Sequence, residues 1–163
     1  MIEWKGIEEM VMDPEKRFGI RVGGYGAKTP EQKFGLLFGA IYVGIGVVGF
    51  AFTGFDNLVL VSEDRLLGIF LLNPFHNIVH ILVGGVVLLG ALVLSPSGTE
   101  GINIGVGGFY LLAAVLGYLG YLDLVNVRHH FDPDNFLHLF SSLAILLFGG
   151  GLLRAMQGQR ANV

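Results

Sequence analysis

The sequence predicts an all-α, integral membrane four-helix bundle made of two helix hairpins. Three observations lead to this fold class. Hydrophobic residues make up 53% of the 163 residues and charged residues only 14%, whereas a soluble domain carries about 25% charged residues. The charges are also bunched, so that four uncharged stretches together hold 97 residues. Finally, an Asn/Asp-Pro pair followed by an Asn-x-x-His motif occurs twice, once in each predicted hairpin, which suggests a pseudo-twofold repeat.

Four uncharged segments are long enough to cross a bilayer core, which needs about 20 apolar residues. They run approximately over residues 34–54, 74–94, 104–122 and 135–153. Three helix starts are marked by a capping residue followed by proline, which suits the first helical position because its missing N–H costs nothing there. These pairs are Thr29-Pro30, Asn73-Pro74 and Asp132-Pro133. We predict that the last two pairs are structural caps of the second and fourth helices.

The chain divides into three predicted parts. Residues 1–33 form a cytoplasmic N-terminal segment, residues 34–153 the four-span bundle and residues 154–163 a cytoplasmic tail. Apolar residues among the charges near the start, Trp4 included, allow a short interfacial helix in the first part. A polar tail without such a helix is an equal alternative.

Lysine and arginine predict the orientation. Six of them lie in the N-terminal segment and two in the C-terminal tail, whereas Arg65 and Arg128 lie in the loops on the opposite side. Because loops rich in Lys and Arg stay in the cytoplasm, we expect both termini there. The two loops with one arginine each then face the outer side of the membrane.

Several function classes are excluded or disfavoured. The absence of cysteine rules out disulfides and thiolate metal sites. A net charge of -3 without a basic stripe rules out nucleic-acid binding. The chain has no HExxH motif and no Walker motif, and no Ser-His-Asp set or carboxylate pair is recognisable within a span. We therefore assign no catalytic residue and expect a protein that is not an enzyme.

The repeated motif carries the polar residues of the spans. It consists of Asn77 and His80 in the second helix, and of Asn135 and His138 in the fourth. Residues at i and i+3 share one helix face. At 1.5 Å per residue, the histidines lie about 9 Å and about 7.5 Å from the prolines that begin their helices. Both are therefore expected in the outer leaflet, where an ionisable residue is a functional candidate.

Three interpretations of these four residues stay open. In the first, the amides and imidazoles form a hydrogen-bonded clamp between the second and fourth helices, which sets their register. In the second, they bind a cofactor: His80 and His138 supply both axial ligands of a haem, or each holds one chlorophyll. The third is a metal or proton site that also uses His76, His129 or His130. No metal-ligand set is assigned, because the nearby carboxylates are expected to cap the fourth helix.

The segment from Leu66 to Leu92, together with residues 134–138, resembles a bacterial family of four-span membrane proteins catalogued only as a domain of unknown function. The shared patterns are LLG-x-x-x-x-N-P-x-H-N-x-x-H-x-x-x-G and D-N-x-x-H. They correspond here to Leu67, Gly68, Asn73, Pro74, His76, Asn77, His80 and Gly84, then Asp134, Asn135 and His138. The resemblance covers roughly residues 34–153. It implies a bacterial plasma membrane or a thylakoid membrane, and it implies no established activity.

The leading functional hypothesis is a non-catalytic accessory or structural subunit of a larger photosynthetic or respiratory membrane complex. Its expected partners are the lipid bilayer and other membrane subunits, bound through glycine-rich helix faces and the N-terminal segment. One alternative is a haem- or chlorophyll-binding protein that uses His80 and His138. Another is a small membrane enzyme or ion pathway at the Asn/His cluster.

Overall fold

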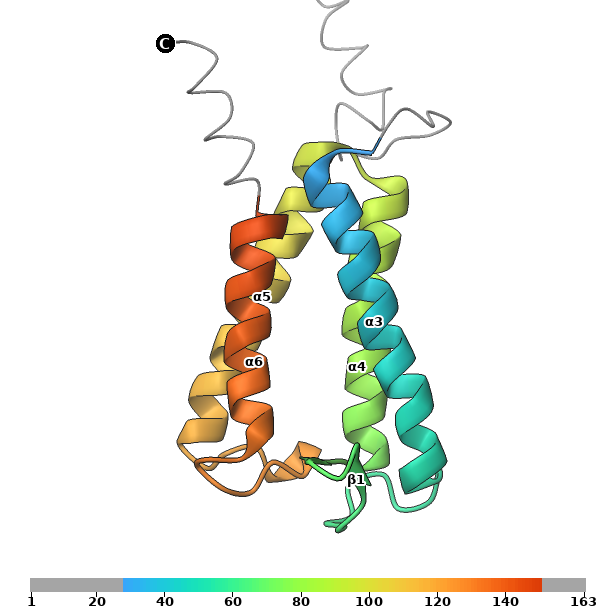
Figure 1. Cartoon of the computed structure of the whole chain (residues 1–163), viewed down its shortest axis with the longest axis vertical. Coiled ribbons are helices and arrows are strands. Elements are labelled where there is room, and N and C mark those ends of the chain that lie inside the picture. The colour runs from blue at the N-terminus through green and yellow to red at the C-terminus, as the bar shows by residue number, and fades with distance from the viewer. Residues whose placement is uncertain (1–27, 151–163) are drawn as a thin grey trace, which may run out of the picture.

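The structure, a computed structural model, describes residues 28–150 as two helix hairpins (Figure 1). The helices are α3 (Pro30–Thr53), α4 (Pro74–Val93), α5 (Pro96–Tyr118) and α6 (Pro133–Ala144), which continues into the π-helical turn η2 (Ile145–Gly149). The loops contain the strands β1 (Arg65–Leu66) and β2 (Phe70–Leu71) and the 3-10 turn η1 (Asp123–Val125). The predicted interfacial helix and C-terminal tail lie outside the described residues.

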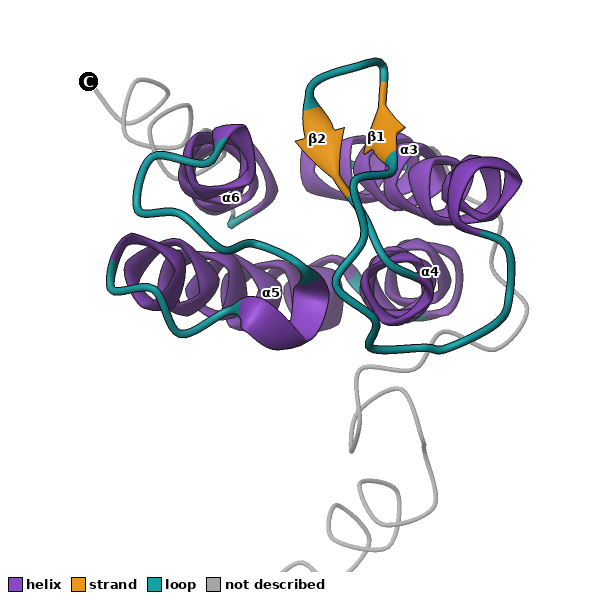
Figure 2. Ribbon diagram, turned by 90° about the horizontal axis from the view of Figure 1, so that it is seen from below, coloured by secondary structure: helices purple, strands orange, loops and turns teal. Residues whose placement is uncertain are grey.

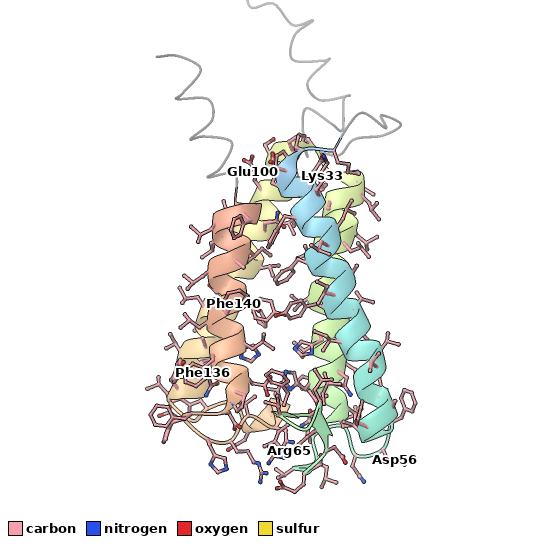
Figure 3. The ribbon with its side chains drawn as sticks, in the orientation of Figure 1. Lys33, Asp56, Arg65, Glu100, Phe136 and Phe140 are labelled. Atoms are coloured by element: carbon pink, nitrogen blue, oxygen red, sulfur yellow. The ribbon has the colours of Figure 1, made fainter. Side chains whose placement is uncertain are left out.

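The predicted all-α bundle is confirmed, and the chain is a membrane protein. Helices α3, α4 and α5 are long and apolar enough to cross a membrane. Figure 3 shows labelled charged residues at the two ends of the bundle, Lys33 and Glu100 at one end and Asp56 and Arg65 at the other. The fourth span is shorter than predicted within the described residues, since it consists of the 12 residues of α6 and the 5 of η2.

The third helix begins earlier than predicted. The expected span started near residue 104, after a loop over 95–103, but α5 begins at Pro96. Ser95 caps it, because its Oγ accepts a hydrogen bond from the N–H of Gly98 at 3.2 Å. This Ser-Pro pair is the same start signal as at the other helices. The charged residue Glu100 suggested a loop at this place, but it lies inside helix α5.

Close helix contacts at glycines hold each hairpin together, and Figure 2 shows α3 beside α4 and α5 beside α6. A Cβ atom at Gly39 of α3 would lie 2.6 Å from the carbonyl oxygen of Gly84 on α4. A Cβ at Gly107 of α5 would lie 2.6 Å from Cγ of Leu146. Small residues let membrane helices approach closely and gain van der Waals contact, which drives helix association in lipid.

The two hairpins meet most closely at the end that carries Lys33 and Glu100 (Figures 1 and 3). There Asn103 of α5 donates a hydrogen bond to the carbonyl oxygen of Glu31 of α3 at 3.4 Å, across the two hairpins, and another to the carbonyl oxygen of Gly149 at 2.8 Å. Gln32 of α3 donates to the carbonyl oxygen of Leu94 at 3.0 Å. These side chains satisfy carbonyl groups that the ends of η2 and α4 leave free.

Loops close the opposite end of the bundle. The Asn126 side chain donates to the carbonyl oxygens of Ser62 at 2.9 Å and Leu72 at 3.0 Å, so it ties the loop of the second hairpin to that of the first. The antiparallel pair β1–β2 was not predicted. Its turn places Leu67 at a φ of 55° and Gly68 at 71°, and leucine gave no signal for this left-handed conformation.

Aromatic rings fill the space between the hairpins. Phe38 and Tyr42 of α3 stack with ring centroids 4.4 Å apart, and Tyr42 lies 5.2 Å from Tyr110 of α5. The hydroxyl groups of Tyr42 and Ser141 of α6 form a buried hydrogen bond. This aromatic core leads along the bundle toward three histidines near the loop-covered end.

Candidate metal centre

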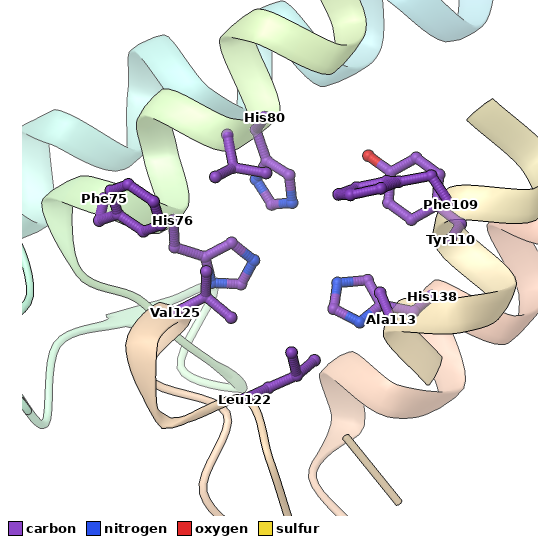
Figure 4. A pocket seen from close by; sticks show the side chains of 10 residues that line it. Phe75, His76, His80, Phe109, Tyr110, Ala113, Leu122, Val125 and His138 are labelled. Carbon is purple, nitrogen blue, oxygen red and sulfur yellow. The ribbon is translucent and has the colours of Figure 1, made fainter. Parts of the chain in front are cut away.

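Helix α4 places two histidines on one face. Asn73 begins the helix, because its Oδ1 accepts a hydrogen bond from the N–H of His76 at 2.8 Å and Pro74 occupies the first turn. His76 and His80 are four residues apart, so their side chains lie one above the other on the helix surface. Their ring centroids are 4.4 Å apart. Both rings point away from α4 into the space between the hairpins (Figure 4).

Helix α6 brings the third histidine to the same place. His138 faces α4 across the bundle (Figure 4), and its ring centroid lies 6.1 Å from that of His76. One ring nitrogen from each of His76, His80 and His138 can be chosen so that all three lie within 4.8 Å of one another. The residues are only 1%, 3% and 4% exposed. The structure therefore gathers three imidazoles from both hairpins in a buried cluster, which we call the His cluster.

The ring nitrogens of the His cluster are short of hydrogen-bond partners. Nδ1 of His76, both ring nitrogens of His80 and Nδ1 of His138 have no partner among the described residues. A buried polar atom without a partner costs roughly 1–3 kcal/mol, so several of them in one place call for a ligand. His76 also has hydrogen-bonding contact with the main chain of Leu71 and Val125, which orients its ring as a second shell does for metal ligands.

The geometry of the His cluster suits a divalent transition metal. In a tetrahedral zinc site the metal–nitrogen distance is about 2.0–2.1 Å, which puts the ligand nitrogens about 3.4 Å apart. The three nitrogens lie within 4.8 Å of one another, so they would move closer together around a bound ion. Imidazole is a preferred ligand of zinc, copper and related ions. The sequence left a metal site as one open interpretation without a ligand set, and the structure brings His76, His80 and His138 together as a candidate set.

The two asparagines of the repeated motif do not join this set. Asn77 donates to the hydroxyl oxygen of Thr53 on α3 at 2.8 Å. Asn135 donates to the carbonyl oxygens of His129 and His130 at 3.1 and 3.0 Å. Neither amide bridges α4 and α6, so the predicted amide clamp between these helices is wrong. Both amides stabilise their own hairpin, and their predicted role in holding a cofactor stays a prediction.

Each asparagine fits against a glycine of the preceding helix. A Cβ atom at Gly49 of α3 would overlap the side-chain amide of Asn77, and a Cβ at Gly117 of α5 would overlap that of Asn135. Both asparagines are fully buried. The sequence repeat is thus a structural repeat, in which an asparagine–glycine contact fixes the depth at which the following histidine lies.

The predicted cap at Asp132 is wrong for its side chain. Its Oδ2 accepts hydrogen bonds from the N–H groups of Arg128 and His129, both at 2.9 Å, and it makes no capping bond to α6. The carboxylate instead closes the loop before Pro133, which does occupy the first turn of α6. His129 and His130 belong to this loop and not to the His cluster.

Asp134 is a buried carboxylate next to the His cluster. When the two motifs are aligned on their asparagines, Asp134 occupies the position of His76. It is 1% exposed, and it lines a small cavity of about 160 Å³ together with His80. Its Oδ2 has no hydrogen-bond partner among the described residues. A buried carboxylate at this place offsets part of the charge of a bound dication.

A larger cavity of about 300 Å³ adjoins all three histidines. Figure 4 shows it between α4, α5 and the loop around η1. Besides the His cluster, its walls are formed by aromatic and aliphatic side chains, which include Phe75, Val79, Phe109, Tyr110, Ala113 and Leu122. Space for a ligand therefore lies directly beside the ring nitrogens.

Sequence reasoning named all three histidines, but it left open whether His76, His129 or His130 joins His80 and His138. The signal for His76 was its spacing of four residues from His80, which places two imidazoles on one helix face. The tyrosines of the aromatic core were less visible. Tyr42 and Tyr110 lie 5.4 and 5.7 Å from His80 and His138, ring centroid to ring centroid, and they come from helices that carry no part of the motif.

Comparison with known proteins gives one match. A family model described as "Domain of unknown function (DUF4383)" matches residues 32–150, which is nearly the whole described part of the chain. No curated protein and no solved structure matches the chain. The match agrees with the resemblance seen in the sequence, and its description names no activity.

Proposed function

The chain belongs to the family described as Domain of unknown function (DUF4383), and we propose that it is a membrane protein that binds one divalent transition-metal ion through His76, His80 and His138. The observation that carries this proposal is the His cluster itself. Three buried imidazoles offer ring nitrogens within 4.8 Å of one another. Intramembrane ionisable residues are rare and mark functional sites, and three at one point in a small bundle have no structural task that fewer polar groups would not fulfil.

Three neutral imidazoles leave the ion its full double charge and an open fourth position. A zinc ion held in this way acts as a Lewis acid toward an oxygen ligand. In the protein, His76 and His80 fix the ion to the first hairpin, and His138 fixes it to the second. The ion would therefore also connect the two hairpins toward the end where they lie farther apart (Figure 1).

The haem alternative fits the cluster less well. Axial ligands of a haem approach the iron from opposite sides, and the plane between them is filled by the macrocycle. A third imidazole nitrogen within 4.8 Å of both others would take up space that the macrocycle needs. The arrangement of the histidines therefore supports a single ion rather than a tetrapyrrole. A Soret band in protein purified from its native membrane would favour the alternative.

A role as a subunit of a larger complex is compatible with metal binding. One face of α5 carries Gly101, Gly105 and Gly108, where a Cβ atom would meet nothing within 4 Å. Such a glycine face lets another membrane helix approach closely. Mass spectrometry of chains that co-purify in mild detergent tests the role. The predicted loss of co-purifying chains in Gly105→Leu would support it, and a pure monomer from the native membrane would contradict it.

The orientation is part of the proposal. With both termini in the cytoplasm, the His cluster lies in the outer half of the membrane. The chain has no cysteine, so single cysteines introduced at exposed positions report the side directly. We expect Asp56→Cys to react with an impermeant maleimide added to intact cells, and Ser97→Cys to react only after lysis. The reverse pattern would contradict the proposed orientation.

Metal content of the purified full chain tests the proposal. The protein is loaded with Zn²⁺ or Co²⁺, freed of unbound ions and measured by inductively coupled plasma mass spectrometry. We expect one ion per chain, and less than about one tenth of an ion in His80→Gln or His138→Gln, which keep much of the side-chain volume. His129→Gln, in the outer loop, is the matched control and should retain the ion. An equal loss in the control, or no bound ion in the original chain, would contradict the proposal.

A further inference from the structure

The cavity of about 300 Å³ beside the His cluster has its mouth between α4 and α5. The two helices approach each other near their connecting turn, where a Cβ at Gly90 would lie 3.4 Å from Ile102. At the depth of the histidines the cavity separates them (Figure 4). Phe109 on α5 is 46% exposed there, and Phe75 and Val79 on α4 are partly exposed. Both helices cross the membrane, so this mouth faces lipid rather than water.

The walls of the cavity define the chemistry of its ligand. No Lys, Arg, Asp or Glu lines it among the described residues, so a charged ligand would find no counter-charge from a side chain. The unpartnered ring nitrogens of the His cluster and the hydroxyl group of Tyr110 lie just behind this apolar surface, on side chains that surround the cavity (Figure 4). The remaining walls are aromatic and aliphatic. A fitting ligand is neutral, with an oxygen at one end and an apolar body.

The size of the cavity further limits the class of ligand that it can bind. A volume of about 300 Å³ is at the lower end for small-molecule sites, and it suits a single six-membered ring better than a whole lipid. The rings of Phe75, Phe109 and Tyr110 offer faces and edges against which an aromatic ring packs. A substituent on that ring can leave through the mouth into the bilayer. A hydroxyl group suits the polar end, because it both donates and accepts hydrogen bonds.

We infer that this cavity binds the head group of a lipid-soluble phenol or quinol, with its hydroxyl oxygen at the His cluster and its alkyl chain passing between α4 and α5 into the lipid. The inference rests on the proposed function where the hydroxyl oxygen becomes the fourth ligand of the ion. It adds to that function a ligand class and a route of entry from the membrane. The occupied cavity would exclude lipid tails from the three imidazoles.

The test uses the full chain in lipid nanodiscs with 4-nonylphenol as the probe. Nonylbenzene, which has the same chain and ring but no oxygen, is the control ligand. Ala113→Trp fills the cavity from α5, while Ala51→Trp adds the same side chain to an exposed position on α3 and is the control variant. Two readouts are taken: binding of the probe beyond its partition into empty nanodiscs, and the visible absorption of the Co²⁺-loaded protein.

We expect saturable binding of 4-nonylphenol, a change in the Co²⁺ absorption on binding, and at least tenfold weaker binding in Ala113→Trp but not in Ala51→Trp. The Co²⁺ content of both tryptophan variants should equal that of the original chain. Equal binding of nonylbenzene, or unchanged binding in a folded Ala113→Trp, would overturn the inference while the bound Co²⁺ leaves the proposed function standing. Saturable phenol binding in a chain that holds no Co²⁺ would overturn the proposed function and support the phenol site alone.

Discussion

The two hairpins position their histidines in the same way. In each, an asparagine near the start of the second helix fits against a glycine of the first helix, and the histidine three residues later points into the space between the hairpins. The pairs are Asn77 with Gly49 and Asn135 with Gly117. The repeated asparagine–glycine contact thus places two imidazoles, those of His80 and His138, at one depth.

The hairpins differ at the position before the asparagine. The first hairpin has His76 there, which joins the cluster of ring nitrogens within 4.8 Å. The second has Asp134, which lies beside His80 in the smaller cavity. The repeat therefore supplies a symmetric scaffold, and one exchanged residue makes the two hairpins unequal, because the first contributes His76 and His80 whereas the second contributes His138 and a buried carboxylate. The following predictions break or sharpen this comparison.

The largest effect is expected at the glycines of the repeat. In Gly117→Ala or Gly49→Ala the new Cβ atom would overlap the buried amide of the facing asparagine, which must move and lose hydrogen bonds. We expect each variant to lower the free energy of unfolding by about 2 to 4 kcal/mol. Thermal unfolding in detergent measures this.

Two other glycines are the matched controls. A Cβ atom at Gly108 of α5 or at Gly44 of α3 would meet nothing within 4 Å. Alanine at either position should leave the stability unchanged or raise it slightly, because alanine is the better helix former. A loss of similar size in the controls and in the glycines of the repeat would contradict the role given to the asparagine–glycine contacts.

The asparagines should differ in importance. Asn135 donates two hydrogen bonds to the loop before α6, whereas Asn77 donates one to Thr53. We expect Asn135→Ala to cost about 2 kcal/mol of stability and Asn77→Ala about 1 kcal/mol, measured by thermal unfolding. The double variant Asn135→Ala with Gly117→Ala should be more stable than the sum of its single effects predicts, because the overlap is gone. Strict additivity would contradict the contact.

Asp134, which occupies the position of His76 in the second motif, should raise the affinity for metal. Asp134→Asn removes a buried carboxylate near the His cluster but leaves the three imidazoles in place. We expect the dissociation constant for Zn²⁺ to rise about tenfold, with the stoichiometry unchanged, as for other residues that support a metal site from outside its ligand set. Competition with a chromophoric chelator measures this. Asp56→Asn, in an exposed loop, is the control, and an equal change there would contradict the role of Asp134.

The smallest effect concerns the ion pair that links the outer loops of the hairpins. Arg128 of the second hairpin lies 2.7 Å from Glu63 of the first, and its hydrogen bond and charge hold the pKa of the Glu63 carboxyl below its ordinary value. The stability from this pair is therefore present above that ordinary pKa and is lost as the pH falls through the lowered one. Because the Glu63 side chain is 74% exposed, solvent screens the pair and its contribution is small.

In Arg128→Ala we expect the pKa of Glu63 to rise toward its ordinary value, which NMR titration of the labelled carboxyl carbon measures. Arg65→Ala serves as the comparison, because the Arg65 contact to Glu63 is longer, at 3.4 Å, and should have less influence on that pKa. A larger change in Arg65→Ala than in Arg128→Ala would contradict the link between the loops.

The helices could be predicted from the sequence because lipid imposes long uncharged stretches and proline marks the first turns. The start of α5 at Pro96 differs from the prediction, because the charged residue Glu100 suggested a loop although Ser95-Pro96 is a capping pair. The strands around Leu67 were missed because a short apolar segment carries no sign of its turn. In both places the average hydropathy did not reveal the local backbone structure.

The candidate site was predictable only in part. The depths of His80 and His138 follow from counting residues after proline, and the structure places their ring nitrogens in one cluster. The directions of the two asparagines depend on glycines in other helices, which no local pattern reveals. The choice among His76, His129 and His130 stayed open, because a single sequence does not show that α4 and α6 face each other across the bundle.

The central claim is that imidazoles from both hairpins hold one ion, and X-ray absorption spectroscopy of the Zn²⁺-loaded full chain tests it most directly. The account predicts a first shell that includes three nitrogens at about 2.0–2.1 Å, with the outer-shell scattering of three imidazole rings. It also predicts that His76→Gln and His138→Gln each remove at least one ring from that signal. A shell of oxygens alone, without imidazole scattering, would contradict the account.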